Sequence, residues 1–173
     1  MKKYELTEET FTVFGKTLYR IRAVRDFGSV KTGEFGGYIE KEENLSHFGN
    51  AWVYGNAKVY GNAWAYGEVQ VAGNAWIYGD ARVFGNAWVY GNAEVFNTRH
   101  FFVQGPIGSR DGYVTFYRTK DDTVEVRCGC FSGSLQEFVN QVEETHGGSR
   151  YEKEYKLAAE LAKVCIRLEG ESR

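Results

Sequence analysis

Proline, cysteine and histidine are scarce in this chain, with one, three and three residues among 173. An odd number of cysteines does not suit a disulfide framework, and residues 1–7 lack the apolar core of an export signal. We therefore expect reduced thiols and a cytoplasmic protein. The single proline beside 21 glycines predicts turns that are built from glycine and asparagine.

The chain also lacks a long apolar run and an excess of charge of one sign. No segment approaches the roughly 20 apolar residues that a membrane-spanning helix needs. The 21 basic and 23 acidic residues nearly cancel, which argues against general binding of nucleic-acid backbones. We therefore expect neither a membrane nor bulk nucleic acid among the partners.

What the chain has in abundance is a six-residue repeat, Ala-x-Val-Tyr-Gly-Asn, which runs from Ala51 to Phe96. A small residue lies four positions after each aliphatic residue, and a glycine lies between the two. The aliphatic positions are Val53, Val59, Ala65, Val71, Ile77, Val83, Val89 and Val95. One repeat cannot bury its own apolar side chain, so this period predicts a parallel β-helix in which the repeats stack.

The pattern resembles the hexapeptide-repeat, left-handed β-helix superfamily, which implies a triangular coil of three repeats, or eighteen residues. In such a coil, the aromatic residues that follow the aliphatic ones form columns on all three faces. A monomer would then expose more apolar surface than soluble monomers usually do. We therefore predict a homo-oligomer, with a trimer favoured, whose interface contains Tyr60, Trp76, Tyr78, Trp88 and Tyr90. The alternative is that the tyrosines simply cover each sheet as cross-strand ladders.

The repeat divides the chain into three predicted parts. Residues 1–38 are predicted to form a β-hairpin cap with strands at 11–14 and 17–24, because the open end of a β-helix needs covering. Residues 39–98 form the β-helix, and residues 99–173 form a small α+β unit. The predicted fold is therefore mainly β.

The C-terminal unit is predicted to contain a hairpin and two helices. The hairpin has strands at 113–119 and 124–128. A capping box at Ser134 opens a helix that continues to about Glu144, and apolar residues at helical spacing predict a second helix from about Tyr151 to Leu168. Whether these helices pack on their own chain or on a neighbouring copy is left open.

The segment Gly105-Pro-Ile-Gly-Ser-Arg110 is the best candidate site in the sequence. Its glycines would let backbone amides approach an anion, and Arg110 offers a planar fork for phosphate or carboxylate. A second Gly/Ser segment, 129–134, precedes a predicted helix N-terminus, where free amides also bind anions. The predicted ligand-binding residues are Arg99, Gly105, Gly108, Ser109, Arg110, Tyr117, Phe131 and Ser132. The alternative is an ordinary loop that leaves the β-helix.

The sequence does not supply the residues that a metal site or a catalytic site would need. Cys128 and Cys130 could share a zinc ion only with two further ligands, and the chain holds three histidines. His47 and His100 bracket the repeat, but the sequence shows no orienting partner that would make either one a general base. We therefore expect no metal, no cofactor and a binding protein rather than an enzyme, while a catalytic role of either histidine stays open.

A closer resemblance begins at Gly36-Gly-Tyr-Ile-Glu-Lys-Glu-Glu-Asn-Leu-Ser-His47, which the Gly-Asn-Ala-x-Val-Tyr repeats follow. This arrangement is similar to a group of hexapeptide-repeat proteins of bacteriophages and prophages, whose members are often labelled transferases or polymer-forming proteins. The resemblance covers nearly the whole chain. It implies a phage origin, and hence the cytoplasm of an infected bacterium.

These features together favour a non-catalytic, oligomeric binding protein. Our specific hypothesis is that it sequesters a small phosphorylated or nucleotide signal of host anti-phage defence. Arg110 and backbone amides would hold phosphate, and Tyr117 or Phe131 would stack on a base. A structural or assembly protein that uses the aromatic faces is the second hypothesis. An acyltransferase that uses acetyl-CoA, which the superfamily resemblance implies, is the third.

Overall fold

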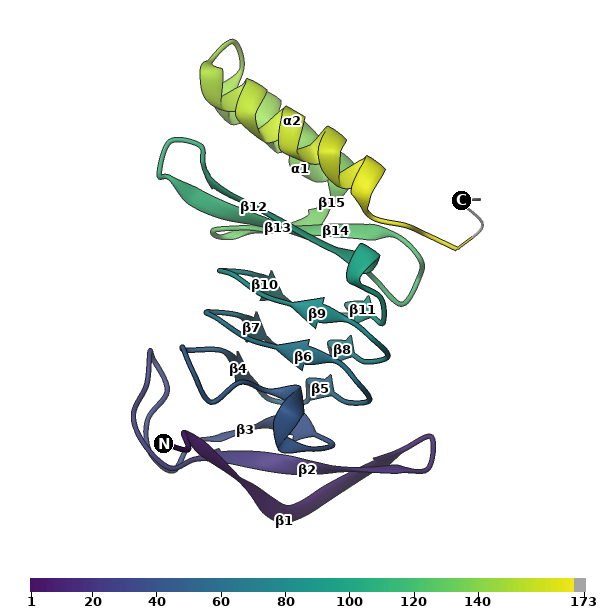
Figure 1. Ribbon diagram of the computed structural model, residues 1–173. Coiled ribbons are helices and arrows are strands. Elements are labelled where there is room, and N and C mark those ends of the chain that lie inside the picture. Colours follow the sequence, from purple (N-terminus) through teal and green to yellow (C-terminus); the bar gives the residue numbers. More distant parts are fainter. Residues whose placement is uncertain (170–173) are drawn as a thin grey trace.

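Short strands in three parallel stacks make a β-solenoid of about three turns, which forms the middle of the molecule (Figure 1). The computed structural model describes residues 1–169. The solenoid strands are β4 (Trp52–Val53), β5 (Lys58–Val59), β6 (Trp64–Ala65), β7 (Gln70–Val71), β8 (Trp76–Ile77), β9 (Arg82–Val83), β10 (Trp88–Val89) and β11 (Glu94–Val95).

The pairing register confirms a coil of eighteen residues. Trp52 pairs with Gln70 and Gln70 with Trp88, so strands one coil apart lie directly over one another. The three stacks are β4–β7–β10, β5–β8–β11 and β6–β9. A positive φ at the corners needs glycine: Gly73 has φ +70°, and a Cβ there would meet the backbone nitrogen of Gly91 at 2.9 Å.

The solenoid core contains the residues that the repeat predicts. Every aliphatic residue of the repeat, from Val53 to Val95, is at most 1% exposed, and so are the small residues from Ala57 to Ala93. The residue before each aliphatic one points outward, because side chains alternate along a strand. The repeat therefore determines which side chains fill the interior of the solenoid, whereas Trp52, on the outside of the first coil, is buried by Tyr4 and Phe27.

The N-terminal strands extend one stack of the solenoid. They are β1 (Tyr4–Val13), β2 (Lys16–Ala23) and β3 (Phe35–Ile39). β1, β2 and β3 pair antiparallel in that order, and β3 then pairs in parallel with β5 of the first coil. The hairpin is longer than the predicted strands at 11–14 and 17–24, and Figure 1 shows it crossing below the first coil.

Side chains satisfy backbone carbonyls of the first coil that have no strand beneath them. The Lys3 ammonium group is fully buried and donates to the carbonyl of Ala51 at 2.6 Å. Asn44, the last residue of the short helix η1 (Glu42–Asn44), donates from its amide to the carbonyl of Ala63 at 2.8 Å. These bonds matter because an unpaired buried carbonyl is costly.

The C-terminal unit is a four-stranded antiparallel sheet covered by two helices. Its elements are η2 (Thr98–His100), β12 (Phe101–Ile107), β13 (Gly112–Arg118), β14 (Val124–Cys128), β15 (Phe131–Ser134), α1 (Leu135–His146) and α2 (Arg150–Cys165). The hairpin and both helices agree with the prediction, although α2 ends three residues before the predicted Leu168. The outer strands β12 and β15 were not predicted, because the glycines in them suggested loops.

The sheet separates the helices from the solenoid (Figure 1). On one face, Phe116 and Val126 pack with Phe138 of α1. On the other face, the Thr115 hydroxyl accepts a hydrogen bond from the backbone N–H of Trp88 at 3.0 Å. Both helices thus pack on the sheet of their own chain, which closes the upper end of the solenoid. None of the helices within residues 1–169 has both the length and the apolar character to cross a bilayer.

Candidate ligand-binding cleft

A cleft of about 900 Å³ lies where the C-terminal sheet, α1, α2 and the third coil of the solenoid meet. Strands β13 and β14 bring residues to it from the sheet, and β10 contributes Trp88 from the solenoid. Its volume falls in the range typical of small-molecule sites. The cleft therefore exists only because the C-terminal unit folds back over the solenoid.

Aromatic side chains form much of the cleft surface. Trp88 is 41% exposed and Tyr113 is 40% exposed, so both rings can be reached by a ligand. Deeper in the cleft, the ring centroids of Phe131 and Phe138 lie 5.5 Å apart, and those of Phe138 and Tyr155 lie 5.8 Å apart. Tilted and edge-on rings at these distances hold one another in place.

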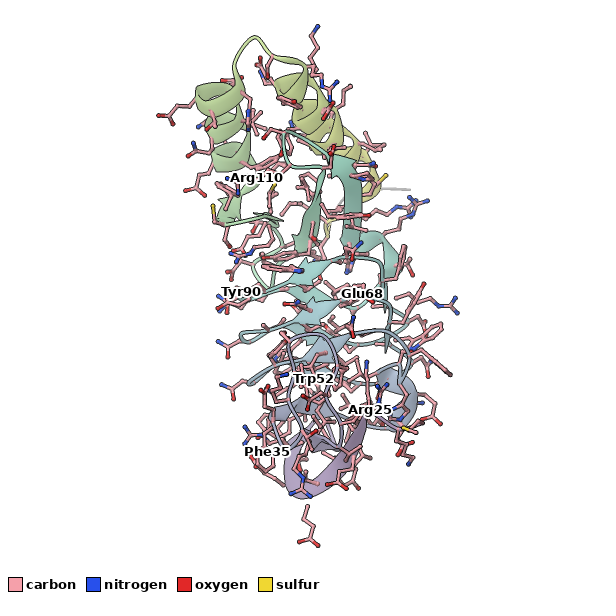
Figure 2. The ribbon with its side chains drawn as sticks, turned by 90° about the vertical axis from the view of Figure 1, so that its left-hand side faces the viewer. Arg25, Phe35, Trp52, Glu68, Tyr90 and Arg110 are labelled. Carbon is pink, nitrogen blue, oxygen red and sulfur yellow. The ribbon has the colours of Figure 1, made fainter. Side chains whose placement is uncertain are left out.

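Two arginines give the cleft its charge. The Arg127 guanidinium lies 5.5 Å from the ring centroids of both Trp88 and Tyr90, and its buried Nε has no hydrogen-bond partner in residues 1–169. Arg110 is exposed on the turn between β12 and β13. Figure 2 shows Arg110 beside the helices and Tyr90 lower on the same side of the molecule. Neither arginine forms an ion pair with a described residue, and no described carboxylate lines the cleft.

Of the two cysteines that line the cleft, Cys130 is exposed and Cys128 is held in its unreactive form. Cys128 lies next to Tyr155, and burial raises the pKa of the Cys128 thiol. Burial also raises the pKa of Tyr155 to about 12, so both groups stay protonated at neutral pH. A neutral thiol is a poor nucleophile and a poor metal ligand. Among residues 1–169, no group of three or more His, Cys, Asp or Glu side chains could hold a metal ion.

The two histidines that bracket the repeat lie outside this cleft. His100 is buried beside Phe96, and burial together with the charge of Arg118 lowers the pKa of His100 to about 4. His47 stacks on Tyr4 at 4.2 Å between ring centroids, and burial lowers the pKa of His47. The histidine that does line the cleft is His146, at the end of α1.

The structure brings only part of the predicted anion cradle at Gly105–Arg110 to the cleft. Ser109 and Arg110 do line the cleft, as does Phe131. The two glycines make room for rings of the protein itself, because a Cβ on Gly105 would meet Tyr113 and a Cβ on Gly108 would meet Tyr155. In addition, the Gly108 amide already donates to the Glu154 carboxylate at 2.7 Å. The Gly108 amide is therefore not free to bind an anion.

Three other predicted ligand-binding residues do not line the cleft. Tyr117 is 0% exposed and belongs to the solenoid core, so it cannot stack on a ligand. Arg99 lines a separate cleft of about 280 Å³, and Ser132 is exposed on β15 but does not line the main cleft. The second Gly/Ser segment ends at Ser134, whose amide donates to Glu137 at 2.8 Å. That helix N-terminus is occupied by its own capping box.

Sequence reasoning missed Arg127, Tyr113 and Tyr155 as cleft residues, and assigned Trp88 to an oligomer interface. Alternation along β13 does distinguish the two faces of the strand. It does not show that one face meets the third coil, because that contact joins residues far apart in the chain. In the structure, the hydrogen bond from the Trp88 N–H to the Thr115 hydroxyl joins β13 to the third coil.

The three faces of the solenoid are covered to different extents. Tyr60, predicted at an oligomer interface, is 4% exposed and packs with Val13 and Leu18 of the hairpin. Trp76 and Tyr78 are partly buried against the same cluster. The β6–β9 face differs, since Trp64 is 40% exposed there and Phe84 is 39% exposed. Of the five predicted interface residues, Trp88 and Tyr90 are therefore exposed, at 41% and 48%, whereas Tyr60, Trp76 and Tyr78 are largely covered.

Comparison with known families finds one match. Residues 75–91, which span β8 to β10, match the family model described as a YdcK beta solenoid repeat. None of the curated proteins matches the chain significantly. Together with the stacked coils of the structure, the match supports a β-helix family for the solenoid.

Proposed function

We propose that this is a non-catalytic binding protein whose cleft holds a small anionic ligand with a planar ring, such as a nucleotide. One observation carries the proposal. The cleft combines accessible aromatic rings with Arg110 and Arg127, and no described carboxylate lines it. A planar ring can stack on Trp88 or Tyr113, while the guanidinium groups bind phosphate oxygens.

Binding without catalysis is the simplest use of these groups. The Cys128 thiol and the Tyr155 hydroxyl are protonated at neutral pH because burial raises both pKa values. The ring centroids of His146 and Tyr155 lie 5.6 Å apart, so the imidazole is a fourth ring beside those of Phe131, Phe138 and Tyr155. These groups supply apolar surface and hydrogen bonds to a bound ligand rather than a nucleophile.

Four further parts of the proposal rest on the sequence resemblance. They are a left-handed coil, membership of the phage and prophage group, a homotrimer, and residence in the cytoplasm of an infected bacterium. In that setting, the ligand would be a nucleotide signal of host defence that the protein sequesters. A structural or assembly role stays the second hypothesis, with the exposed Trp64 and Phe84 as contact residues. An acetyl-CoA-dependent acyltransferase stays the third.

The proposal is tested by native mass spectrometry of protein purified from cells that produce defence nucleotides. We expect a stoichiometric small molecule that contains phosphate, and loss of most of it in Trp88→Ala. Trp64→Ala is a matched control, because Trp64 occupies the same position in its repeat and is exposed to nearly the same extent, 40% against 41%.

Two outcomes would contradict the proposal. One is a folded protein that carries no ligand and takes up neither nucleotides nor acetyl-CoA, which would favour the structural role. The other is binding and turnover of acetyl-CoA, which would favour the acyltransferase.

A further inference from the structure

The outer side of α2 carries a stripe of apolar side chains. Leu157, Leu161 and Val164 are 70%, 47% and 81% exposed. Residues spaced four and three apart lie on one side of a helix, so these side chains adjoin one another over about 10 Å. The buried side of the same helix, which contains Ala158 and Ala162, packs with residues of the sheet and of α1. α2 is therefore apolar on two sides.

The neighbouring helix α1 has no such stripe. Both helices lie on the far side of the sheet from the solenoid (Figure 1). The exposed residues of α1 are polar or charged, among them Gln136, Asn140, Glu143 and Glu144, as is usual for a surface helix. The three stripe residues of α2 belong to none of the hydrophobic clusters of residues 1–169. No described part of the chain therefore covers the stripe.

The stripe continues toward the β6–β9 face through the smaller cleft. Leu161 adjoins Cys165, which lies one turn later on the helix, and Cys165 lines the cleft of about 280 Å³ together with Phe84. The Phe84 ring stacks on Tyr66, which stacks on Trp64. We refer to the α2 stripe together with Phe84 and Trp64 as the outer apolar surface.

The size of the outer apolar surface matches one side of a protein interface. The three stripe residues, with Trp64 and Phe84 at 40% and 39% exposure, present on the order of 400 Å² of apolar area. A standard interface buries about 800 Å² on each partner, and somewhat more than half of it, or about 450 Å², is apolar. The surface is therefore large enough for a stable contact.

The charges beside the stripe favour a second copy of this chain as the partner. Lys153 and Glu160 are exposed on α2 and lie seven residues, or about two turns, apart along the same edge of the stripe. In an antiparallel pair of identical helices, each lysine can face the glutamate of the other copy. A partner with charge of one sign would match only one of the two residues.

We infer that the outer apolar surface binds the same surface of a second copy, with the two α2 helices antiparallel about a two-fold axis. The inference rests on the self-association that the proposed function includes, and it does not depend on the ligand of the cleft. It places the contact on the C-terminal helix rather than on the residues that the repeat predicts. Removal of both apolar stripes from water drives the association.

The test is sedimentation velocity ultracentrifugation of the parent, Leu157→Glu and Val164→Glu over a range of concentrations. We expect the parent to be a dimer, or a hexamer if the predicted trimer also forms, and each variant to shift toward half that mass. The dissociation constant should rise at least tenfold, because each variant brings like charges together in an apolar contact. Thr12→Glu is the control, since it adds the same charge to exposed β1 at the other end of the molecule.

A charge exchange tests the antiparallel arrangement. Lys153→Glu should weaken the pair, and Lys153→Glu combined with Glu160→Lys should restore it, because the two charges then face each other in reversed order. No recovery in the double variant would overturn the antiparallel pair. Val164→Lys should dissociate the pair as Val164→Glu does, and dissociation by only one of them would contradict burial of the stripe.

The remaining outcomes separate this inference from the proposed function. An unchanged mass in Leu157→Glu and Val164→Glu, with circular dichroism showing that both are folded, would overturn the inference and leave self-association through another surface. A parent that is monomeric at every concentration would overturn both the inference and the predicted oligomer. Native mass spectrometry should find the same small molecule in the parent and in Val164→Glu, since the stripe does not line the main cleft.

Discussion

At the scale of single residues, close contacts in the C-terminal unit determine where glycine is required. Gly108 has φ +77° and lies directly against the Tyr155 ring, while its amide is bonded to Glu154. The glycine thus allows the β12–β13 turn to dock on α2. That contact positions Arg110 at the rim of the cleft, so a residue without a side chain supports a functional one.

We predict that Gly108→Ala destabilises the protein by about 2 kcal/mol or more, because both the positive φ and the Tyr155 ring oppose a Cβ. Urea unfolding followed by circular dichroism measures this change in the free energy of unfolding. Gly112→Ala is the control, since a Cβ there meets no atom within 4 Å and the change is expected to be small. Equal stability of the two variants would contradict the close contact between Gly108 and the Tyr155 ring.

His100 gives a second prediction at this scale, a loss of stability in mild acid. Its pKa is lowered from 6.5 to about 4 in the folded protein, chiefly by burial. The unfolded chain therefore binds more protons than the folded chain between these pH values, so stability falls as the pH falls through this window. The full contribution is about 3 kcal/mol, from the size of the shift.

The measurement is the free energy of unfolding of parent and His100→Asn at pH 7, 5.5 and 4.5. Acidic groups near Arg118 titrate in both proteins, so the difference between the two isolates the histidine. We expect the parent to lose more stability than the variant across this range. Parallel curves would show that folding does not lower the pKa of His100.

At the scale of elements, the first coil differs from the later ones in how its backbone is hydrogen-bonded. Side chains satisfy some of its carbonyls, whereas strands of the neighbouring coil satisfy those of the later coils. Each inner coil receives its hydrogen bonds from the coil above and the coil below. The first coil has β3 beneath one of its sides, and the side chains of Lys3 and Asn44 donate hydrogen bonds to backbone carbonyls on the other two. The short helix η1 is therefore a structural element, although it contributes no strand.

We predict that Asn44→Ala destabilises the protein by about 2–4 kcal/mol. The buried amide donates to the carbonyls of Gly61 and Ala63 and accepts from the amide of Lys41, so the change removes three hydrogen bonds. Thermal unfolding compares it with Asn62→Ala, whose exposed side chain bonds only Asp80. Similar melting temperatures for the two variants would show that η1 does not support the first coil.

At the scale of the whole molecule, the solenoid faces differ because the two ends of the chain fold over them. The β1–β2 hairpin covers Tyr60, and Arg127 covers part of Trp88 and Tyr90. The β6–β9 face keeps a stacked aromatic row, with Trp64 and Tyr66 at 4.2 Å and Tyr66 and Phe84 at 5.6 Å between centroids. If the predicted homo-oligomer forms, this row is one aromatic surface that it could bury, and Trp88 and Tyr90, at 41% and 48% exposed, are the other.

We predict that Trp64→Glu shifts the oligomer toward monomer without lowering the melting temperature of the monomer. Tyr78→Glu should behave differently, because Tyr78 stacks on Tyr60 at 5.1 Å and donates to Glu94, so the change should unfold the protein. Native mass spectrometry and thermal unfolding distinguish dissociation from unfolding. An oligomer that survives Trp64→Glu would place the interface elsewhere.

The sequence alone determined the solenoid, because its six-residue period assigns each side chain to the core or the surface and places a glycine at each corner. It also located the hairpin at 113–128 and both helices through local signals such as the capping box at Ser134. Of the residues that line the cleft, it named Ser109, Arg110 and Phe131 as ligand-binding residues. These features depend on residues close together in the chain.

Only the tertiary structure decided which aromatic faces are covered and where the cleft lies. Burial of Tyr60 requires a hairpin more than forty residues away, and the cleft requires Thr115 to meet Trp88 and Tyr155 to meet Gly108. Period and propensity carry no information about such contacts, because they describe neighbours along the chain. The docking of the C-terminal unit on the third coil therefore determines the site, although the repeat determines the scaffold.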